Sequence, residues 1–433
     1  MRFPTALIIS LALMAFTSCN QDRPDHLKIR VIQTSDVHGA IFPVDFLNQQ
    51  QPIASMAHVS SFVKKQRKLR GTEIILLDNG DMLQGDPSVY YSNFMDTTNK
   101  HIASRVYNYL NYDAVCIGNH DIEPGHEVYD KMIQEMNMPM LGANAIRNED
   151  SVPYFKPYQI ISKKGVRIAV LGLTTPAVPT WLPEKIWEGM HFEDMVQSAE
   201  KWMKIIKKNE NPDLIIGLLH SGVDYTYNGQ DENTRKNENA SQLVAEKVAG
   251  FDIIMVGHDH TGWNKKVLNT AGEEVLILGP TSRARDVAVA DIEFFYNANS
   301  DTYEKEINSM IVATGDQEPD AEYLKKFGAF QNQITEYVSR PVGKIATKMD
   351  SRKSILGPAA FTDIIHMLQF DKTGAEISFT SPLSFNTIVD TGDIFIKDLF
   401  KLYRFENLLY TMKLTGDEID KFLEFSYALW FGG

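Results

Sequence analysis

Cysteine is scarce in this chain of 433 residues, which contains only Cys19 and Cys116. Two cysteines cannot form a disulfide framework, and we expect Cys116, which lies in an apolar run, to be a small core residue. Positive charge is also in deficit, because the formal net charge is −13. This balance argues against binding to nucleic acid polymers, which requires a basic face. Beyond the N-terminus, no apolar run approaches the length of about 20 residues that spans a bilayer as a helix.

The N-terminus has the pattern of an export signal. Arg2 is followed by an apolar run over residues 6–16 and then by Thr17-Ser18-Cys19, which matches a basic region, a short apolar region and a small-residue end. The cysteine after Thr-Ser resembles a bacterial lipobox, which predicts that Cys19 becomes the lipidated first residue of the mature protein. Plain cleavage is the alternative. In either case we expect an exported protein in the periplasm or at the cell surface, which contacts the membrane only through a lipid anchor.

The length predicts more than one domain, because hydrophobic cores stop growing at about 250–300 residues. Hydrophobic residues make up 43% of the chain and charged residues 23%, as in ordinary folded proteins. We place an export signal over residues 1–19, a first domain over 27–314, a linker helix over 315–340 and a second domain over 341–433.

Short apolar runs followed by polar residues recur along the first domain and predict buried strands. They begin at Leu27 and continue over residues 74–77, 114–117, 214–219 and 253–256. Helix-like stretches lie between them, over residues 58–69, 128–136, 195–208 and 240–249. Strands that alternate with helices predict an α/β fold, in which ligands bind beyond the carboxyl ends of the strands. Two further strands are predicted over residues 287–295 and 303–312.

The rest of the chain predicts a spacer and a smaller region. Residues 320–337 read as one exposed helix that begins behind Pro319. The second region contains a helix candidate over 361–370 and a strand-like stretch over 376–379. Thr415 and Glu418 match a capping box, and the helix that follows has an apolar face formed by Ile419, Phe422, Leu423, Tyr427 and Trp430. The chain stops soon after this face, which predicts an incomplete second domain.

A set of residues directly after the predicted strands has the chemistry of metal ligands. Asp36 and His38 are spaced i, i+2 at a strand end, a spacing that places two strand side chains on one face, and His258 and His260 repeat it. The set mixes nitrogen and oxygen donors without a thiolate, which suits Zn, Mn, Fe, Co or Ni better than Ca or Mg. A shared carboxylate would hold two divalent metal ions about 3.5–4 Å apart, as in enzymes that hydrolyse phosphate esters. The members are Asp36, His38, Asp81, Asn119, His220, His258 and His260.

The order of these motifs resembles that of the calcineurin-like metallophosphoesterases. Asp36-Val-His38, Gly80-Asp81, Gly118-Asn-His-Asp121, His220-Ser-Gly222 and Gly257-His-Asp-His260 carry the resemblance. Gln84-Gly85-Asp-Pro87 and Asn239-Ala240 narrow it to the 5′-nucleotidase branch, which includes 5′-nucleotidases, UDP-sugar hydrolases and 2′,3′-cyclic-nucleotide 2′-phosphodiesterase/3′-nucleotidases. The resemblance implies a four-layer αββα metallophosphoesterase sandwich over 27–314, followed by a 5′-nucleotidase-type α/β domain that grips the nucleoside.

The resemblance also implies roles for the site residues. Asp36, His38 and His260 would hold the first metal ion, and Asn119, His220 and His258 the second, with Asp81 between them. His120 would stabilise the phosphoryl transition state or protonate the leaving oxygen. Relatives orient that histidine with an Asp three residues later, where this chain has Glu123, and Asp121 stands where they usually have Glu. Either Glu123 reaches the imidazole with its longer side chain, or the role is absent.

The C-terminal region bears on the substrate. Residues 377–385, Gly392-Asp-Ile and Leu414-Thr-Gly416 resemble the 5′-nucleotidase C-terminal domain. The substrate-gripping arginine that 5′-nucleotidases carry is replaced here by Ser381-Pro-Leu-Ser-Phe385, a pattern closer to the cyclic phosphodiesterase/3′-nucleotidase members. Phe385 or Tyr403 could stack on a base, although core packing is favoured. Arg283 and Arg285 could meet a phosphate, but a solvated loop is the preferred interpretation, and both are left out of the site.

We therefore expect a dimetal phosphoesterase that hydrolyses a nucleotide or cyclic nucleotide outside the cytoplasm for nucleotide salvage. A protein phosphatase is disfavoured, because those enzymes show Asp-Arg-Gly after their Gly-Asp motif, where this chain has Met82-Leu-Gln-Gly85. Two further hypotheses are a metallophosphatase for a non-nucleotide ester and a catalytically impaired surface binding protein on the same fold. The complete set of seven ligands argues against the impaired protein.

Overall fold

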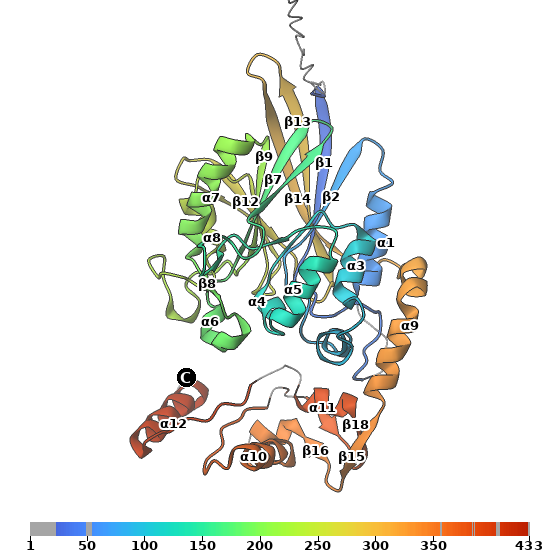
Figure 1. The fold of residues 1–433 in the computed structure, drawn as a ribbon, viewed down its shortest axis with the longest axis vertical. Coiled ribbons are helices and arrows are strands. Elements are labelled where there is room, and N and C mark those ends of the chain that lie inside the picture. Colours follow the sequence, from blue (N-terminus) through green and yellow to red (C-terminus); the bar gives the residue numbers. More distant parts are fainter. Residues whose placement is uncertain are drawn as a thin grey trace, which may run out of the picture.

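The computed structural model describes residues 23–48, 54–355, 357–382, 384, 386–403 and 408–431. The predicted lipidation site, Cys19, lies outside these residues. No helix within the described ranges is both long and apolar enough to span a membrane. Figure 1 shows two stacked sheets with helices on both sides, and a smaller C-terminal region below them.

The first sheet has six strands and is parallel through its centre. Strands β1 to β4 run parallel to one another, and β13 pairs antiparallel with both β1 and β14. The order is β14 (Thr302–Ala313), β13 (Asp286–Asn297), β1 (His26–Thr34), β2 (Thr72–Asp78), β3 (Ala114–Cys116) and β4 (Met140–Leu141).

The second sheet also has six strands, with a parallel centre and antiparallel edges. Strands β7, β9, β10 and β12 are parallel, while β6 and β11 close the two sides antiparallel. The order is β11 (Trp263–Leu268), β12 (Glu274–Gly279), β10 (Ile253–Val256), β9 (Leu214–His220), β7 (Val166–Thr174) and β6 (Tyr158–Lys163).

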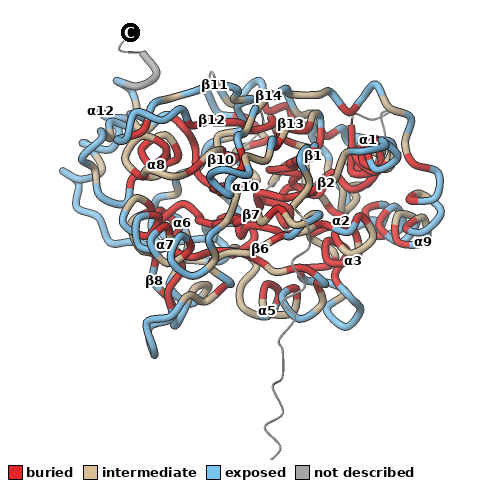
Figure 2. The backbone as a smooth tube through the Cα atoms, turned by 90° about the horizontal axis from the view of Figure 1, so that it is seen from above, coloured by how far each residue is buried: buried red, intermediate tan, exposed pale blue. Residues whose placement is uncertain are grey.

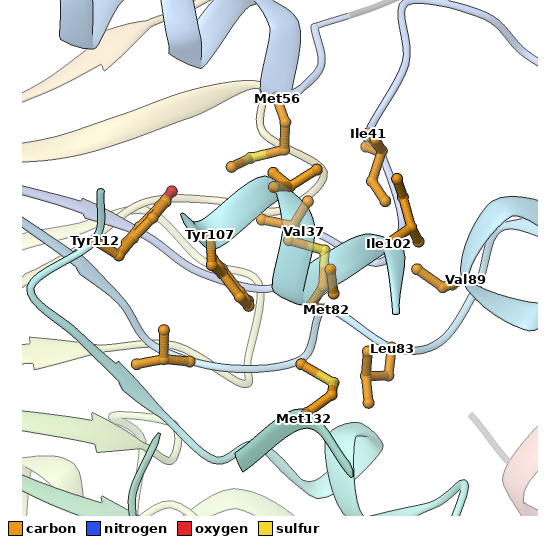
Figure 3. Packing of buried hydrophobic residues seen from close by; sticks show 14 of the residues in the cluster. Val37, Ile41, Met56, Met82, Leu83, Val89, Ile102, Tyr107, Tyr112 and Met132 are labelled. Atoms are coloured by element: carbon orange, nitrogen blue, oxygen red, sulfur yellow. The ribbon is translucent and has the colours of Figure 1, made fainter. Parts of the chain in front are cut away.

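The continuous apolar runs are explained by burial on both faces of each sheet. In β2, Ile75 and Leu77 point into the core between the sheets, while Leu76 belongs to the core on the outer face. Helices α1 (Met56–Gln66), α3 (Ile102–Leu110) and α5 (His126–Glu135) cover that outer core, part of which is drawn in Figure 3. Helices α7 (Met195–Glu210) and α8 (Ser241–Lys247) cover the outer face of the second sheet. The predicted four-layer αββα sandwich is thus confirmed, and Cys116 is buried between the sheets as expected.

Helix α9 (Ala321–Val338) corrects one expectation. It was predicted to be exposed, yet its aromatic and aliphatic stripe is buried in the same core as α1 and α3. Its N-cap Asp320 accepts hydrogen bonds from the backbone N–H groups of Glu322 and Tyr323 and pairs with Lys64 of α1. The interpretation as an exposed spacer was wrong, because the stripe follows i, i+3 and i, i+4 spacing and so gives the helix an apolar face. Its buried members are Tyr323, Phe327, Phe330, Ile334, Tyr337 and Val338.

Among its described residues, the C-terminal region has two short ribbons, three α-helices and a 3-10 helix over Ser351–Ile355. Its small core contains five buried residues, Met349, Phe361, Ile365, Val389 and Leu402. The predicted capping box is confirmed, because the Thr415 N–H donates to Glu418 Oε2 at 2.7 Å. The prediction of a strand over residues 376–379 was wrong, since the backbone there is irregular. The elements are β15 (Pro341–Ile345) with β18 (Gly392–Phe395), β16 (Met349–Asp350) with β17 (Ile388–Val389), α10 (Ala360–Thr373), α11 (Ile396–Leu402) and α12 (Gly416–Phe431).

Burial differs between the two parts of the molecule. Figure 2 shows buried residues along the central strands of the sheets and on the inner sides of their helices, and exposed residues along α12. The short elements of the first part include a ribbon of β5 (Ala145–Arg147) with β8 (Met190–Phe192). Two short helices carry residues of the site, namely α4 (Asn119–Ile122) and α6 (Val178–Trp181).

Candidate metal centre

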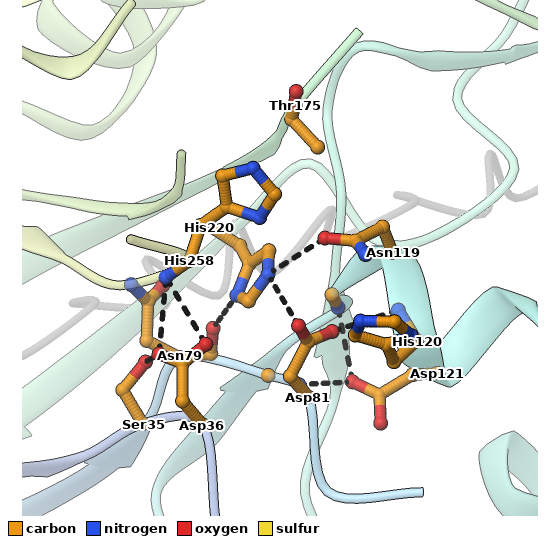
Figure 4. Close-up of polar contacts among 12 residues, drawn as sticks. Ser35, Asp36, Asn79, Asp81, Asn119, His120, Asp121, Thr175, His220 and His258 are labelled. Carbon is orange, nitrogen blue, oxygen red and sulfur yellow. Dashed lines mark hydrogen bonds and ion pairs between the residues drawn. The ribbon is translucent and has the colours of Figure 1, made fainter. Parts of the chain in front are cut away.

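Five loops at the carboxyl ends of parallel strands bring the predicted ligands together. The loops after β1, β2 and β3 come from the first sheet, and His220 ends β9 in the second sheet. His258 and His260 follow β10 in that second sheet. Figure 4 shows side chains from both sheets pointing toward one another at this edge. Residues far apart in the sequence thus converge, as ligands do at the strand ends of α/β sheets.

The first group of candidate ligands consists of Asp36, His38 and His260, whose ligand atoms all lie within 4.8 Å of one another. His38 Nε2 and His260 Nε2 are 2.9 Å apart, and His260 Nε2 is 3.4 Å from Asp36 Oδ1. Burial alone would raise the pKa of Asp36, but the contact with His260 and the nearby histidines lower it below its usual value. Asp36 is therefore a charged carboxylate in this group.

The second group consists of Asp81, His220 and His258, again within 4.8 Å. His220 Nε2 lies 3.1 Å from Asp81 Oδ2 and 3.1 Å from Asn119 Oδ1. Burial would lower the pKa of His220, but the Asp81 carboxylate outweighs it and the pKa rises to about 10. The carboxylates of this edge thus strongly favour positive charge beside them.

The backbone, rather than strand alternation, aims these side chains. Each ligand pair lies in a loop after its strand has ended, so the expectation that i, i+2 spacing on a strand orients them was wrong. Left-handed backbone, which non-glycine residues rarely adopt, recurs at five of the ligands and marks tight functional loops. The φ angles are 51° at Asp36, 47° at His38, 59° at Asp81, 77° at His258 and 57° at His260.

The second contacts of two histidines fit a metal site. His220 Nδ1 contacts the Asn79 carbonyl oxygen at 2.5 Å, and His38 Nδ1 contacts the Gln84 carbonyl oxygen at 3.1 Å. Each carbonyl accepts a hydrogen bond from Nδ1–H, which leaves the lone pair of Nε2 to bind a metal ion. This is the usual arrangement around metal-binding histidines. The imidazole, carboxylate and amide donors suit a borderline transition metal. The residues present therefore fit two divalent cations.

Asp121 holds the loop that carries Asp81. Its carboxylate accepts hydrogen bonds from the backbone N–H groups of Asp81, Met82, Leu83 and Gly118, at 2.8 to 3.1 Å. Burial raises the pKa of Asp121 to about 6. A side chain at Gly118 would not fit, since its Cβ would lie 2.2 Å from Asp81 Oδ1. Both oxygens of Asp121 are thus engaged by the backbone of the Asp81 loop and of Gly118.

The His120 imidazole pairs with the carboxylate of Glu123 and not with that of Asp121. His120 Nδ1 lies 2.7 Å from Glu123 Oε2, so the longer side chain does reach the imidazole. Burial lowers the pKa of His120, but the Asp81 and Glu123 carboxylates outweigh it and raise the pKa to about 9. With Nδ1 engaged, Nε2 is the nitrogen left to donate to another group.

Two adjoining cavities open at the site. One of about 600 Å³ is lined by His38, His120 and His258 among others. A second cavity of about 1200 Å³ lies between the first domain and the C-terminal region, and Glu123, Trp181 and Leu182 line both. Tyr403 also lines the larger cavity while packing on the small C-terminal core, and Phe385 lies outside the described residues.

Several residues that line the smaller cavity were not in the predicted site, among them Arg283, Glu238 and Trp181. Arg283, interpreted as part of a solvated loop, lines this cavity instead, and its backbone N–H donates to the Asp36 carbonyl. Glu238 and Trp181 also line it, and both contact His258. A weak signal existed for Glu238, which directly precedes Asn239-Ala240 in the sequence, and none existed for Trp181. Arg285, in contrast, is exposed and bonds to Ser282.

Comparison with known families agrees with this architecture. The sequence profile of the calcineurin-like phosphoesterase family matches residues 29–262, and that of the 5′-nucleotidase C-terminal domain matches residues 341–430.

Individual relatives are distant. The trifunctional nucleotide phosphoesterase YfkN of Bacillus subtilis is 24% identical over 98% of this chain, and the chain spans only 32% of its length. A 5′-nucleotidase of Vibrio cholerae is 26% identical over 96% of this chain and 79% of its own. Among solved structures, a putative 5′-nucleotidase from Staphylococcus aureus aligns with a TM-score of 0.71 at 20% identity, over 87% of this chain and 72% of its own. At that identity the match shows the shared fold.

Proposed function

The chain belongs to the calcineurin-like phosphoesterases, and on that premise we propose that it is an exported dinuclear-metal enzyme that hydrolyses phosphate esters of nucleotides. The substrates would be 5′-nucleotides, or 2′,3′-cyclic nucleotides and 3′-nucleotides. The export pattern ending at Cys19 supports a lipoprotein of the periplasm or cell surface.

One observation carries the proposal. Two groups of three ligating side chains lie at the same edge of the sandwich, beside a cavity that His120 also lines. In this assignment Asp36, His38 and His260 would hold one divalent cation, Asn119, His220 and His258 would hold the other, and Asp81 would be shared. When bound, such a pair neutralises phosphate charge and lowers the pKa of water from about 15.7 to about 7.

The protein's own residues then divide the remaining work. Glu123 holds the His120 ring so that the other nitrogen can donate a hydrogen bond to a phosphoryl or leaving oxygen. Asp121 keeps the Asp81 loop in place through backbone hydrogen bonds. The larger cavity, which shares Glu123 and Trp181 with the smaller one, has room for a nucleoside.

The names of relatives support nucleotides as the substrate class. They include a 5′-nucleotidase from Vibrio cholerae and a 2′,3′-cyclic-nucleotide 2′-phosphodiesterase/3′-nucleotidase from Yersinia enterocolitica. The absence of an arginine in Ser381-Pro-Leu-Ser-Phe385 favours the second activity.

The test is phosphate release by the purified chain loaded with Mn²⁺, Zn²⁺ or Co²⁺. The panel contains 5′-, 3′- and 2′,3′-cyclic nucleotides, a UDP-sugar and p-nitrophenyl phosphate, with the Asp81→Asn variant as the blank. Hydrolysis of cyclic and 3′-nucleotides above that blank is the expected result. Activity confined to p-nitrophenyl phosphate would refute nucleotides as substrates, and no activity with any ester would refute the hydrolase itself.

A further inference from the structure

The end of the segment that connects β9 to α8 is hydrogen-bonded to Ser221, the residue that follows His220. The Ser221 hydroxyl donates to the Glu238 carbonyl oxygen at 2.7 Å and accepts from the Ala240 N–H at 2.9 Å. The Thr175 hydroxyl donates to the same carbonyl at 3.0 Å, and the Glu238 N–H donates to Gln230 Oε1 at 3.0 Å. The backbone of Glu238 is therefore held by several elements.

Gly222 is required by the same segment. A Cβ at Gly222 would lie 2.4 Å from Asn239 Oδ1, so the segment packs too closely for any side chain there. Ser221 and Gly222, the last two residues of the His220-Ser221-Gly222 motif, thus hold residues 238–240 in position. Since His220 itself belongs to the second ligand group, the motif connects that group to Glu238.

The side chain of Glu238 reaches the other histidine of the second group. Glu238 Oε1 lies 3.3 Å from His258 Nε2, and the two side chains are only 16% and 13% exposed. Trp181 stacks on the His258 ring with centroids 5.6 Å apart and planes 29° apart. The His258 backbone N–H donates to the Asp36 carboxylate. Backbone, ring face and ring edge of His258 are all engaged.

We propose that Glu238 is a positioning residue for His258, because its carboxylate accepts a hydrogen bond from Nε2–H and so leaves Nδ1 for a divalent cation. This rests on the proposed dinuclear site. A carboxylate behind a metal-binding imidazole fixes its tautomer and raises its basicity, and losing such a partner costs about 10- to 100-fold in metal affinity.

The experiment is a Mn²⁺ titration of the metal-free chain, followed by electron paramagnetic resonance, for Glu238→Ala, Glu238→Gln and the matched control Glu149→Gln. Glu149 is exposed. The wild type and the control should bind two ions and show the spectrum of a coupled pair. In Glu238→Ala the second ion should bind about 10- to 100-fold more weakly, leaving a single-ion spectrum at intermediate Mn²⁺. Glu238→Gln, which keeps an acceptor without charge, should fall between them.

The outcomes separate the two proposals. A wild-type chain that binds fewer than two ions would refute the dinuclear site itself. A wild type that binds two ions and a Glu238→Ala variant that binds them equally well would overturn the role of Glu238 alone. If Glu238→Ala does not fold by circular dichroism, the nearly isosteric Glu238→Gln decides, and unchanged affinity there overturns the proposal.

The choice of nitrogen can be tested separately. An asparagine side chain places its amide near the position of Nδ1, whereas glutamine extends toward that of Nε2. His258→Asn should therefore retain more of the second Mn²⁺ than His258→Gln. The reverse order would overturn the assignment of Nδ1.

Discussion

Residues 23–340 and residues 341–431 bury their apolar side chains to very different extents. The first part has three extensive cores, between and on both sides of its sheets, whereas the described C-terminal region has one core of five buried residues. Met367, Met412 and Phe425 in that region are 69%, 71% and 65% exposed. Local stability follows buried apolar contact, so the candidate metal centre lies on the more stable part and one wall of the larger cavity on the less stable part.

This difference separates two tasks of the proposed enzyme. Bond cleavage would depend on loops fixed by the sandwich, and nucleoside binding would also depend on the C-terminal region. Substitutions of the candidate ligands in the first part should therefore impair all phosphate esters alike. Substitutions in the second part should impair nucleotides while sparing a small ester that does not fill the larger cavity.

The largest effect is expected for Asp81→Asn. Asp81 is 1% exposed and contacts His220, and losing its charge would remove several kcal/mol of cation binding and charge stabilisation. At about 1.36 kcal/mol for each tenfold change, kcat should fall by about 10³-fold or more for both p-nitrophenyl phosphate and nucleotides. Steady-state kinetics with bound metal measured in parallel tests this, with the exposed Asp316→Asn as control. A loss of activity toward nucleotides alone would contradict the proposed division, in which the first part cleaves the bond and the C-terminal region helps to bind the nucleoside.

Glu123→Gln should have a smaller effect. An amide at this position can still contact His120 Nδ1 but no longer provides a charge, so the ring is held less firmly. General acid–base catalysis contributes about 10²- to 10⁴-fold, and we expect kcat to fall by about 10- to 100-fold with both kinds of ester, because orientation is only part of that contribution.

Glu123→Asp is the matched comparison, since it keeps the carboxylate and restores the residue that the family usually has. It should retain more kcat than Glu123→Gln. Full activity in Glu123→Gln would show that the 2.7 Å contact to His120 has no role in turnover.

Phe379→Ala tests the C-terminal region. Phe379 lines the larger cavity and packs edge-on against Phe422, with ring centroids 4.9 Å apart. Aromatic contacts contribute about 0.5–1.5 kcal/mol beyond their area, so KM for nucleotides should rise about 2- to 10-fold, with p-nitrophenyl phosphate unaffected. Phe425→Ala in α12, which does not line the cavity, is the control. Equal changes with both esters would show that the two regions do not act separately.

The sequence predicted the sheets and the convergence of the candidate ligands, because both depend on local signals. An apolar run that ends in a polar residue marks a strand end. Five candidate ligands lie at such an end or within three residues of it, namely Asp36, Asp81, Asn119, His220 and His258. The orientation of those side chains came from left-handed backbone in the loops, which the i, i+2 spacing does not encode.

The residues that the sequence missed, and the error about residues 320–337, share a cause, which is contact between segments distant in the chain. Glu238 meets His258 across 20 residues and Trp181 meets it across 77, so no local pattern marks either residue. The prediction of an exposed helix over residues 320–337 failed because acidic residues at its start mark a helix N-terminus and not its burial, which depends on the Tyr323–Tyr337 stripe packing on the core of the first sheet. The irregular 376–379 stretch has apolar residues but no partner strand among the described residues.

The smallest effect is expected on thermal stability, for substitutions at the N-termini of two helices, α9 and α12. Asp320 caps α9, is 8% exposed and contacts Lys64, whereas Asp417 in the first turn of α12 is exposed. Asparagine keeps a capping oxygen, so Asp320→Asn removes only the negative charge. Losing a charge at a helix N-terminus costs about 0.3–1 kcal/mol, and up to about 2 kcal/mol at a partly buried site. Each kcal/mol shifts the Tm of a domain of this size by about 2–4 °C. Asp320→Asn should therefore lower the Tm of the first part by a few degrees at pH 7, while Asp417→Asn should leave it unchanged, within about 0.5 kcal/mol.

The same pair gives a pH dependence with a defined sign. Burial raises the pKa of Asp320, but hydrogen bonds from Lys64, Ser60 and the backbone outweigh it, so the pKa lies below its usual value. A carboxyl whose pKa is lowered by folding stabilises the folded state above its unfolded pKa of about 3.9, and this contribution is lost as the pH falls through the folded value. The Tm difference between wild type and Asp320→Asn, measured by calorimetry, should thus shrink from pH 7 toward pH 3. A constant difference would mean that Asp320 acts through shape alone, and a large effect of Asp417→Asn would mean that α12 is packed as firmly as α9.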